Sequence, residues 1–368
     1  MIIPIPIPVA LLSLLLIASL PEPLWARSLP KNLLVAYQSW SECDDAVLTH
    51  VQNGANVVIW FAVNLHADES GGPSISGGPN RTCVEEMIVK LDDLGFGRDD
   101  VTHLISVGGW DSPHPDTTFT AEQYAEAFET FSGGLYDGLD WDLEGNDSLT
   151  APSNFFSADC LRLMADLSTV LSDRGYIVSM APPESYLDVQ SSSFSKFVNL
   201  TYPSDSLWPP PTFSYHGRNA YAVALALAPD AFDFVSIQIY ETKSHAAYNT
   251  SILGTPQDEY AVEYFRRLLT EPFVVDFTGD KDFGYLGAVN IHIPLASKVV
   301  IGLISAGGIG GPITATNATN AYRSVDADPS VNGNVRGFMY WCIGDDKDGE
   351  LPLILNEVLG IREGRRVR

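Results

Sequence analysis

A stretch of eight residues concentrates side chains that can do acid–base chemistry. Residues 137–144 read Asp-Gly-Leu-Asp-Trp-Asp-Leu-Glu. Because side chains alternate along a β-strand, Asp140, Asp142 and Glu144 would share one face of it. Burying three carboxyl groups side by side costs solvation and adds repulsion, so folding alone gives no reason to keep them. Such crowding also raises a carboxyl pKa and holds one acid protonated near neutral pH, which predicts a general acid.

The other side chains of this stretch agree with a strand. A calcium-binding loop would be polar between its acids, whereas Leu139, Trp141 and Leu143 favour a strand with an apolar outer face. Asp137 has the opposite parity to the three inner acids. We therefore expect Asp137 to be a structural hydrogen-bonding residue.

Eight β-rich runs are available to position these acids. The runs are almost continuously apolar, as strands buried on both faces are. Segments with helical spacing lie between them and begin at capping signals. The predicted strands are 32–38, 56–63, 102–107, 135–142, 176–180, 232–240, 298–304 and 335–341. The predicted helices begin at Thr82 with Glu85, at Thr120 with Gln123, and at Thr255 before Pro256, and one more covers 154–174.

This alternation predicts an α/β fold, a single (β/α)8 TIM barrel with loop insertions, over residues 27–368. The acids would then lie at the C-terminal mouth of the barrel, where active sites of this fold lie. A doubly wound dinucleotide-binding fold is disfavoured because the glycine-rich run 305–311 lacks the third glycine of its fingerprint. The segment 187–229 is a long irregular insertion and a candidate active-site loop.

The N-terminus predicts secretion. Residues 9–20 form an apolar run of 12 residues, and Ala26 offers a small residue for cleavage, so we expect 1–26 to be a signal peptide. No Lys or Arg precedes the run, which leaves a retained membrane anchor as the alternative. Five N-glycosylation sequons, at Asn80, Asn146, Asn199, Asn249 and Asn317, agree with an extracellular location.

The cysteines and charges narrow the classes of function further. The spacing of Cys43, Cys83, Cys160 and Cys342 is wide, which disfavours zinc and redox motifs and leaves free thiols and one or two disulfides open. Lys and Arg number 21 against 46 Asp and Glu, a net charge of −25, so we expect neither nucleic acid nor an anionic membrane as partner. The seven histidines form no metal motif, and no cofactor is predicted.

The acidic stretch and four other short motifs resemble those of one family of enzymes. Residues 137–144 resemble the D-G-x-D-x-D-x-E signature of the family 18 glycoside hydrolases, the chitinases and their relatives. Four other landmarks of that family follow in the same order, and the match spans residues 32–341. They are S-x-G-G at 106–109, M-A-P at 180–182, Q-x-Y at 238–240 and the final Trp at 341.

The resemblance implies a mechanism in which the substrate's own 2-acetamido oxygen attacks the anomeric carbon, with retention of configuration. Glu144 would protonate the leaving oxygen and then act as base on water. Asp142 would orient the acetamide N–H and stabilise the oxazolinium charge, and Asp140 would share a proton or hydrogen bond with Asp142. Tyr240 would hold the acetamide carbonyl.

The resemblance also implies substrate contacts. Trp341 would form the floor under the sugar, and Met180 would either pack in the core or touch the sugar. Glu241 departs from the family, which often has Asn there, and the sequon at Asn146 is expected to be unused because it adjoins the acids. The remaining residues expected to contact substrate or Asp142 are Gln238, Gly109 and Trp110.

The expected function is that of a secreted, monomeric chitinase that binds chitin or N-acetylglucosamine oligosaccharides. An endo-β-N-acetylglucosaminidase that cuts N-glycan cores would use the same acids and is the first alternative. A non-catalytic chitin-binding lectin on the same barrel is the second. Relatives of that kind typically lose the acid that Glu144 supplies here.

Overall fold

The computed structural model describes residues 29–146, 148, 150–198, 218–241, 244–291, 299–305, 314–331 and 335–361. The predicted signal peptide, Asn199 and much of the 187–229 insertion lie outside these residues. Within the described part of the chain, no helix is both long enough and apolar enough to cross a membrane.

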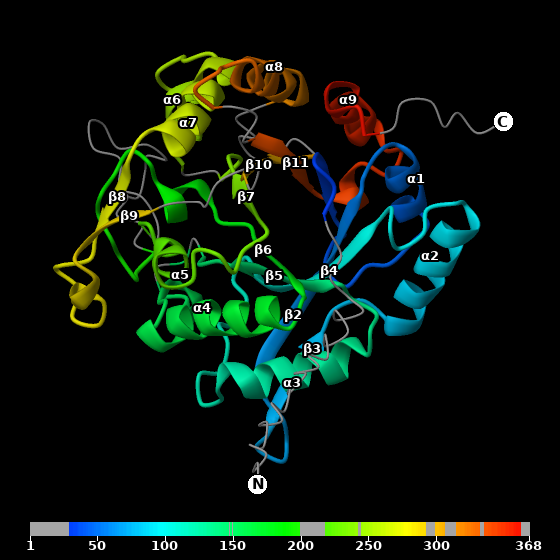
Figure 1. Ribbon diagram of the computed structural model, residues 1–368, viewed down its shortest axis with the longest axis horizontal. Coiled ribbons are helices and arrows are strands. Elements are labelled where there is room, and N and C mark those ends of the chain that lie inside the picture. The colour runs from blue at the N-terminus through cyan, green and yellow to red at the C-terminus, as the bar shows by residue number, and fades with distance from the viewer. Residues whose placement is uncertain are drawn as a thin grey trace, which may run out of the picture.

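Eight parallel strands close into a barrel, as the sequence predicts. The neighbours run in the order β1-β2-β4-β5-β6-β7-β10-β11, and β11 pairs with β1 to complete the ring. Helices surround the strands (Figure 1). The barrel strands are β1 (Leu33–Tyr37), β2 (Val57–Ala67), β4 (Thr102–Gly109), β5 (Gly138–Leu143), β6 (Ile177–Met180), β7 (Phe234–Gln238), β10 (Val299–Ile304) and β11 (Val335–Trp341).

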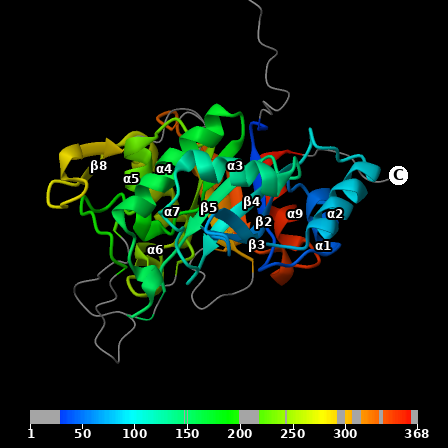
Figure 2. The ribbon, with the colours of Figure 1, turned by 90° about the horizontal axis from the view of Figure 1, so that it is seen from below.

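Three further strands were not predicted. β3 (Pro73–Gly77) pairs antiparallel with β2 outside the barrel. β8 (Phe273–Asp276) and β9 (Ala288–Ile291) form an antiparallel hairpin between α7 and β10. This hairpin lies at the edge of the molecule (Figure 2). All three strands are short and partly exposed, so they lack the apolar runs that identify the barrel strands.

The helices confirm one of the three predicted capping signals. Thr120 and Gln123 form the expected capping box of α3. α2 is capped by Asn80, two residues before the predicted Thr82, and α7 begins after Pro256 without a side-chain cap from Thr255. The helices are α1 (Ala46–Gln52), α2 (Arg81–Asp93), α3 (Ala121–Ser132), α4 (Ala158–Asp173), α5 (Ala222–Leu227), α6 (His245–Ser251), α7 (Gln257–Thr270), α8 (Ala315–Asp326) and α9 (Glu350–Leu359).

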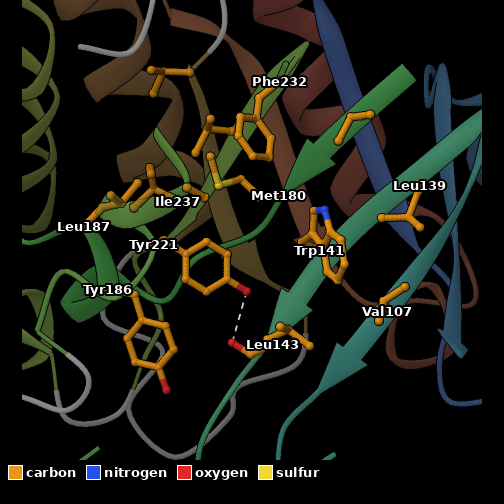
Figure 3. Close-up of a cluster of buried hydrophobic side chains, with 14 of the residues drawn as sticks. Val107, Leu139, Trp141, Leu143, Met180, Tyr186, Leu187, Tyr221, Phe232 and Ile237 are labelled. Atoms are coloured by element: carbon orange, nitrogen blue, oxygen red, sulfur yellow. Dashed lines mark hydrogen bonds between the residues drawn. The ribbon is translucent and has the colours of Figure 1, made fainter. Parts of the chain in front are cut away.

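The outer face of the barrel carries the main hydrophobic core. Leu139, Trp141 and Leu143 point toward the helices, as their parity predicts, and are fully buried there (Figure 3). The indole Nε1 of Trp141 donates to Ser168 Oγ of α4 at 2.9 Å. The opposite face of the same strand is therefore free to hold the acids inside the barrel.

One disulfide decides the open question of the cysteines. Cys43, in the loop after β1, is bonded to Cys83 of α2, with the two Cα atoms 6.2 Å apart. Cys160 and Cys342 are buried free thiols. The disulfide fixes the loop that follows Tyr37 to a helix of the outer ring.

Replacing Cys43 and Cys83 together by Ser should destabilise the protein. The bond closes a loop with a sequence separation of 40 residues, whose chain entropy corresponds to about 3–4 kcal/mol of unfolding free energy. Urea unfolding of the oxidised protein and the double variant measures this difference. Reduction of the unmodified protein should give a similar loss, and a difference below about 1 kcal/mol would contradict the structural role.

Candidate active site

The three inner acids come together at the mouth of the barrel. Asp140 and Asp142 extend from β5, and Glu144 follows its last residue, so the acids share the inner face of that strand. Asp140 is fully buried, Asp142 is 4% exposed, and Glu144 is partly exposed. The residue with the most accessible surface among the three is thus the one expected to donate a proton to substrate.

Asp140 is held by three hydroxyl groups, two from the neighbouring strands β4 and β6 and one from β1 across the barrel. Tyr37 Oη and Ser106 Oγ donate to its Oδ2 at 2.6 and 2.7 Å, and Ser179 Oγ donates to its Oδ1 at 2.6 Å. Burial raises the pKa of Asp140, and the three hydrogen bonds oppose that rise by stabilising the anion. The expected bond from Asp140 to Asp142 is replaced by these hydroxyl contacts.

Asp142 and Glu144 form a coupled pair. Burial, followed by the charges of Glu144 and Asp140, raises the pKa of Asp142 well above its ordinary value. Burial raises the pKa of Glu144 to about 7, opposed by hydrogen bonds from Gln238 and from Asp142. Two adjacent carboxyl groups in such an environment share one proton near neutral pH.

Gln238 fixes the orientation of this pair, and its expected contact with Asp142 is present. Its Nε2 lies 2.8 Å from Asp142 Oδ1, 3.2 Å from Glu144 Oε1 and 2.7 Å from the carbonyl oxygen of Ala181. An amide nitrogen has only two hydrogens, so these three acceptors compete for them. The amide therefore prevents the carboxyl groups from rotating independently.

Two aromatic residues expected at the site adjoin the acids. Burial, together with the charges of Asp142 and Glu144, raises the pKa of the Tyr240 hydroxyl well above its ordinary value. Trp341 is partly exposed, and its ring centroid lies 6.0 Å from that of Tyr37. Both side chains pack against the inner core of the barrel and leave part of their surface at the mouth.

Trp40 and Trp341 form an aromatic wall at the mouth of the barrel, and the sequence analysis missed Trp40. It is 47% exposed, and its ring packs edge-on against Phe61 at 4.5 Å and against Trp341 at 6.4 Å. Gly109 makes room for this contact, because a Cβ added there would lie 2.4 Å from Trp40 and 2.5 Å from Phe61. The position of Trp40, two residues after the end of the predicted strand 32–38 at the mouth, was the available signal.

Trp110 and Met180, the two other residues expected to contact substrate, lie in different environments. Trp110 is 57% exposed at the end of β4, where it is available to a ligand. Met180 is fully buried and lies with Trp141 and Ile237 in the outer core (Figure 3). It pairs in register with Trp141, which places it on the helix-facing side of the sheet. Met180 is therefore a packing residue, and the alternative that it contacts the sugar is wrong.

A second pair of acids, Glu241 (partly buried) and Glu184 (fully buried), lies beside the first. Glu241 accepts from the N–H and Oγ of Ser185 at 3.1 and 2.9 Å, and burial raises its pKa to about 8. Glu184 accepts from Ala246 N at 2.9 Å and from the hydroxyl of Tyr260, and burial raises its pKa to about 7. The sequence analysis missed Glu184 because its partners follow it by 62 and 76 residues.

Two polar residues near the acids have structural contacts. Asp137 accepts from His103 N at 2.8 Å and from the Arg98 guanidinium at 3.3 Å, as expected of a structural hydrogen-bonding residue. Asn146 is 9% exposed, and its Oδ1 accepts from Ser148 N at 2.6 Å. Burial of this amide supports the expectation that the sequon at Asn146 carries no glycan.

Comparison with solved structures shows which proteins share this fold. The C-terminal domain of ChiA from Legionella pneumophila has a TM-score of 0.60 at 16% identity and covers 90% of this chain and 99% of its own. A family 18 chitinase from Pseudoalteromonas aurantia has a TM-score of 0.52 at 15% identity and covers 89% of this chain and 99% of its own. Concanavalin B has a TM-score of 0.51 at 11% identity and covers 89% of this chain and 98% of its own. No family model and no curated protein matches the chain. The barrel is thus one that family 18 chitinases have.

Proposed function

We propose that the protein is a family 18 glycoside hydrolase that cleaves β-1,4-linked N-acetylglucosamine polymers, a chitinase. The observation that carries this proposal is the Asp142–Glu144 pair. One member is buried, the other is partly exposed, and the pKa of Glu144 is raised to about 7. Such a pair keeps a proton available to a leaving group at neutral pH. The shared fold with solved chitinases supports the same reading.

In the proposed reaction the substrate supplies the nucleophile. Its acetamido oxygen forms a bond to the anomeric carbon as the glycosidic C–O bond breaks, and Glu144 gives its proton to the leaving oxygen. Asp142 accepts a hydrogen bond from the acetamide N–H and stabilises the positive oxazolinium ion, while Tyr240 positions the acetamide oxygen. Water then attacks the anomeric carbon and opens the oxazolinium ring. Glu144 takes a proton from this water, so the acid is regenerated and the original configuration is retained.

Of the two alternatives, the site argues against the lectin and leaves the endo-β-N-acetylglucosaminidase to experiment. A non-catalytic lectin would have no need of a partly exposed, proton-sharing Glu144 beside a buried Asp142. An endo-β-N-acetylglucosaminidase would use the same acids, so the catalytic group does not exclude it. The Cys43–Cys83 disulfide supports the proposed secretion, because such bonds persist in oxidising compartments.

Parallel assays on an N-acetylglucosamine hexamer and on an N-glycosylated protein test the proposal. We expect cleavage of the hexamer with β-configured products. Because Glu144 must be protonated to donate, the rate should fall as the pH rises through about 7. Release of glycans without cleavage of the hexamer would favour the endo-β-N-acetylglucosaminidase. No cleavage of either substrate between about pH 3 and 8 by the folded protein would refute catalysis.

A further inference from the structure

We propose that Phe155 and Phe197 form a sugar-binding platform that holds the leaving-group part of a long chitin chain. This inference rests on the proposed function, and it names a place where the substrate continues beyond the bond that is cut. Phe155 follows the short helix η1 (Pro152–Asn154) in the loop after β5, and Phe197 lies in the insertion after β6.

The two phenylalanines form one exposed aromatic surface. Phe155 is 43% exposed and Phe197 is 57% exposed, and their ring centroids are 4.7 Å apart with 36° between the planes. The backbone on either side of the pair forms a short antiparallel bridge. Its hydrogen bonds run from Phe156 N to Lys196 O and from Val198 N to Asn154 O, both at 2.9 Å. The rings are thus presented by paired backbone and not by a single loop.

This surface adjoins the proposed acid. Gly145 follows Glu144, and a Cβ added to it would lie 2.6 Å from Asn154 Oδ1 and 2.6 Å from a methyl group of Val198. Asn154 directly precedes Phe155, and Val198 directly follows Phe197. The chain neighbours of both phenylalanines therefore contact the residue after Glu144.

The platform and the Trp40–Trp341 wall lie on different sides of the acid pair. Trp40 and Trp341 come from the β1 and β11 side of the barrel, whereas the phenylalanines belong to the loops after β5 and β6. Trp341 would lie under the sugar whose bond breaks. A sugar chain that continues from there past Glu144 would place its leaving-group sugars near the loops after β5 and β6. The platform lies where the leaving sugars would be.

The loop of Trp110 is joined to the same surface. Asp111 N donates to the carbonyl of Gly145 at 3.1 Å, and Ser153 Oγ donates to Asp111 Oδ1 at 2.9 Å. Ser153 lies in η1, two residues before Phe155. The exposed aromatic side chains of Trp110, Phe155 and Phe197 thus belong to segments that are hydrogen-bonded to each other around Gly145.

The β8–β9 hairpin braces the platform from behind. Lys196, next to Phe197, is 6% exposed, and its ammonium group lies 2.9 Å from Asp280 and also binds Asp282. Both aspartates lie in the connection between β8 and β9. These carboxylates neutralise Lys196, so its ammonium group adds no uncompensated charge beside the two rings.

The chemistry of this surface suits a neutral sugar. Pyranose rings present apolar C–H faces that pack on exposed aromatic rings, which bury area from water on both sides. The protein carries a net charge of −25, and two aspartates neutralise Lys196 beside the rings, so a neutral sugar is favoured over an anionic ligand. Because the platform adjoins the acid site at Gly145, its expected occupant is the leaving end of the chitin chain.

Alanine at both positions is the direct test, with Tyr285→Ala as matched control. Tyr285 is 69% exposed in the connection between β8 and β9, outside the loops after β5 and β6 that carry the platform. In a Glu144→Gln background, the Kd of the hexamer should rise by about tenfold or more for the double alanine variant. In the active enzyme, the loss in kcat/KM should be at least about fivefold larger for the hexamer than for the trimer, which is too short to reach the platform fully.

Further variants and outcomes keep the test decisive. Tryptophan at both positions should restore hexamer binding, whereas a structural role would not be rescued by a larger ring. Hexamer binding and cleavage that are unchanged in the alanine variant would overturn the platform. The same result with a loss of self-association would assign the surface to a second copy of this chain instead.

The failure of the platform is distinguishable from the failure of the proposed function. If the wild-type protein binds the hexamer without cleaving it, and the alanine variant binds it more weakly, the platform stands and the catalytic proposal falls. A wild-type protein that binds no hexamer overturns both.

Discussion

Glu144→Gln should reduce hexamer cleavage by roughly 10²- to 10⁴-fold while leaving hexamer binding largely intact. The amide preserves the size of the side chain and can still accept from Gln238, which lies 3.2 Å from Glu144 Oε1. It has no proton to give to the leaving oxygen, so the loss falls on kcat. Isothermal titration of the hexamer and initial rates measure the two effects separately.

The pH dependence gives this variant a second signature. The pKa of Glu144 is raised to about 7, so the folded protein binds this proton more tightly than the unfolded chain does. The stability that comes from the proton is present at acid pH and is lost as the pH rises through about 7. Glu144→Gln should therefore gain more unfolding free energy, relative to wild type, at pH 8 than at pH 4. Its residual activity should also lack the basic limb.

A matched exposed acid provides the control. Glu126 lies on the solvent side of α3, and Glu126→Gln should change neither the rate nor the pH profile. Near wild-type cleavage by Glu144→Gln would assign the proton donor to another group and remove the basis of the mechanism.

Asp142→Asn should slow hexamer cleavage by about 10²-fold or more, for an electrostatic reason. In the wild-type protein Gln238 Nε2 lies 2.8 Å from Asp142 Oδ1. The amide oxygen of asparagine can accept the same hydrogen bond, so the geometry of the pair should survive. It carries no negative charge to stabilise an oxazolinium ion, and it shares no acidic proton with Glu144. The pH–rate profile should then reflect Glu144 alone.

The kinetics separate this role from a structural one. A loss in kcat with KM little changed indicates an interaction made mainly in the transition state. Thermal unfolding should show no loss of stability, because one of three crowded carboxyl groups has been removed. Asp159→Asn, at an exposed position of α4, serves as control. An increase in KM alone would instead make Asp142 a ground-state binding residue.

The parts of the molecule that the sequence predicts are those with a local periodic signal. All eight barrel strands are apolar runs, and the parity of 137–144 correctly separates Asp140 and Asp142 from Trp141. The β8–β9 hairpin has no such run, since Val274 is 40% exposed and alternates with buried neighbours. Its existence depends on packing that the local pattern does not encode.

The contacts within the site were predicted less well than its residues. Asp140 binds Tyr37 from 103 positions away, and the hydroxyls of Ser106 and Ser179 complete the set. A serine in an apolar strand gives no sign of its partner until the strand order is known. The family resemblance suggested a role for Met180, whereas its register with Trp141 places it in the outer core.

The position of β1 in the ring has a consequence for how the protein is made. β1 pairs with β2 on one side and with β11, about 300 residues later, on the other. Tyr37 of β1 binds Asp140, and Trp341 of β11 packs beside Tyr37. A ribosome that has released β1 to β10 has thus produced a sheet with two open edges and an unfinished acid site, the proposed catalytic centre. Hydrolytic activity should therefore appear only when the last barrel strand emerges, so activity in a translation time course would report closure of the ring.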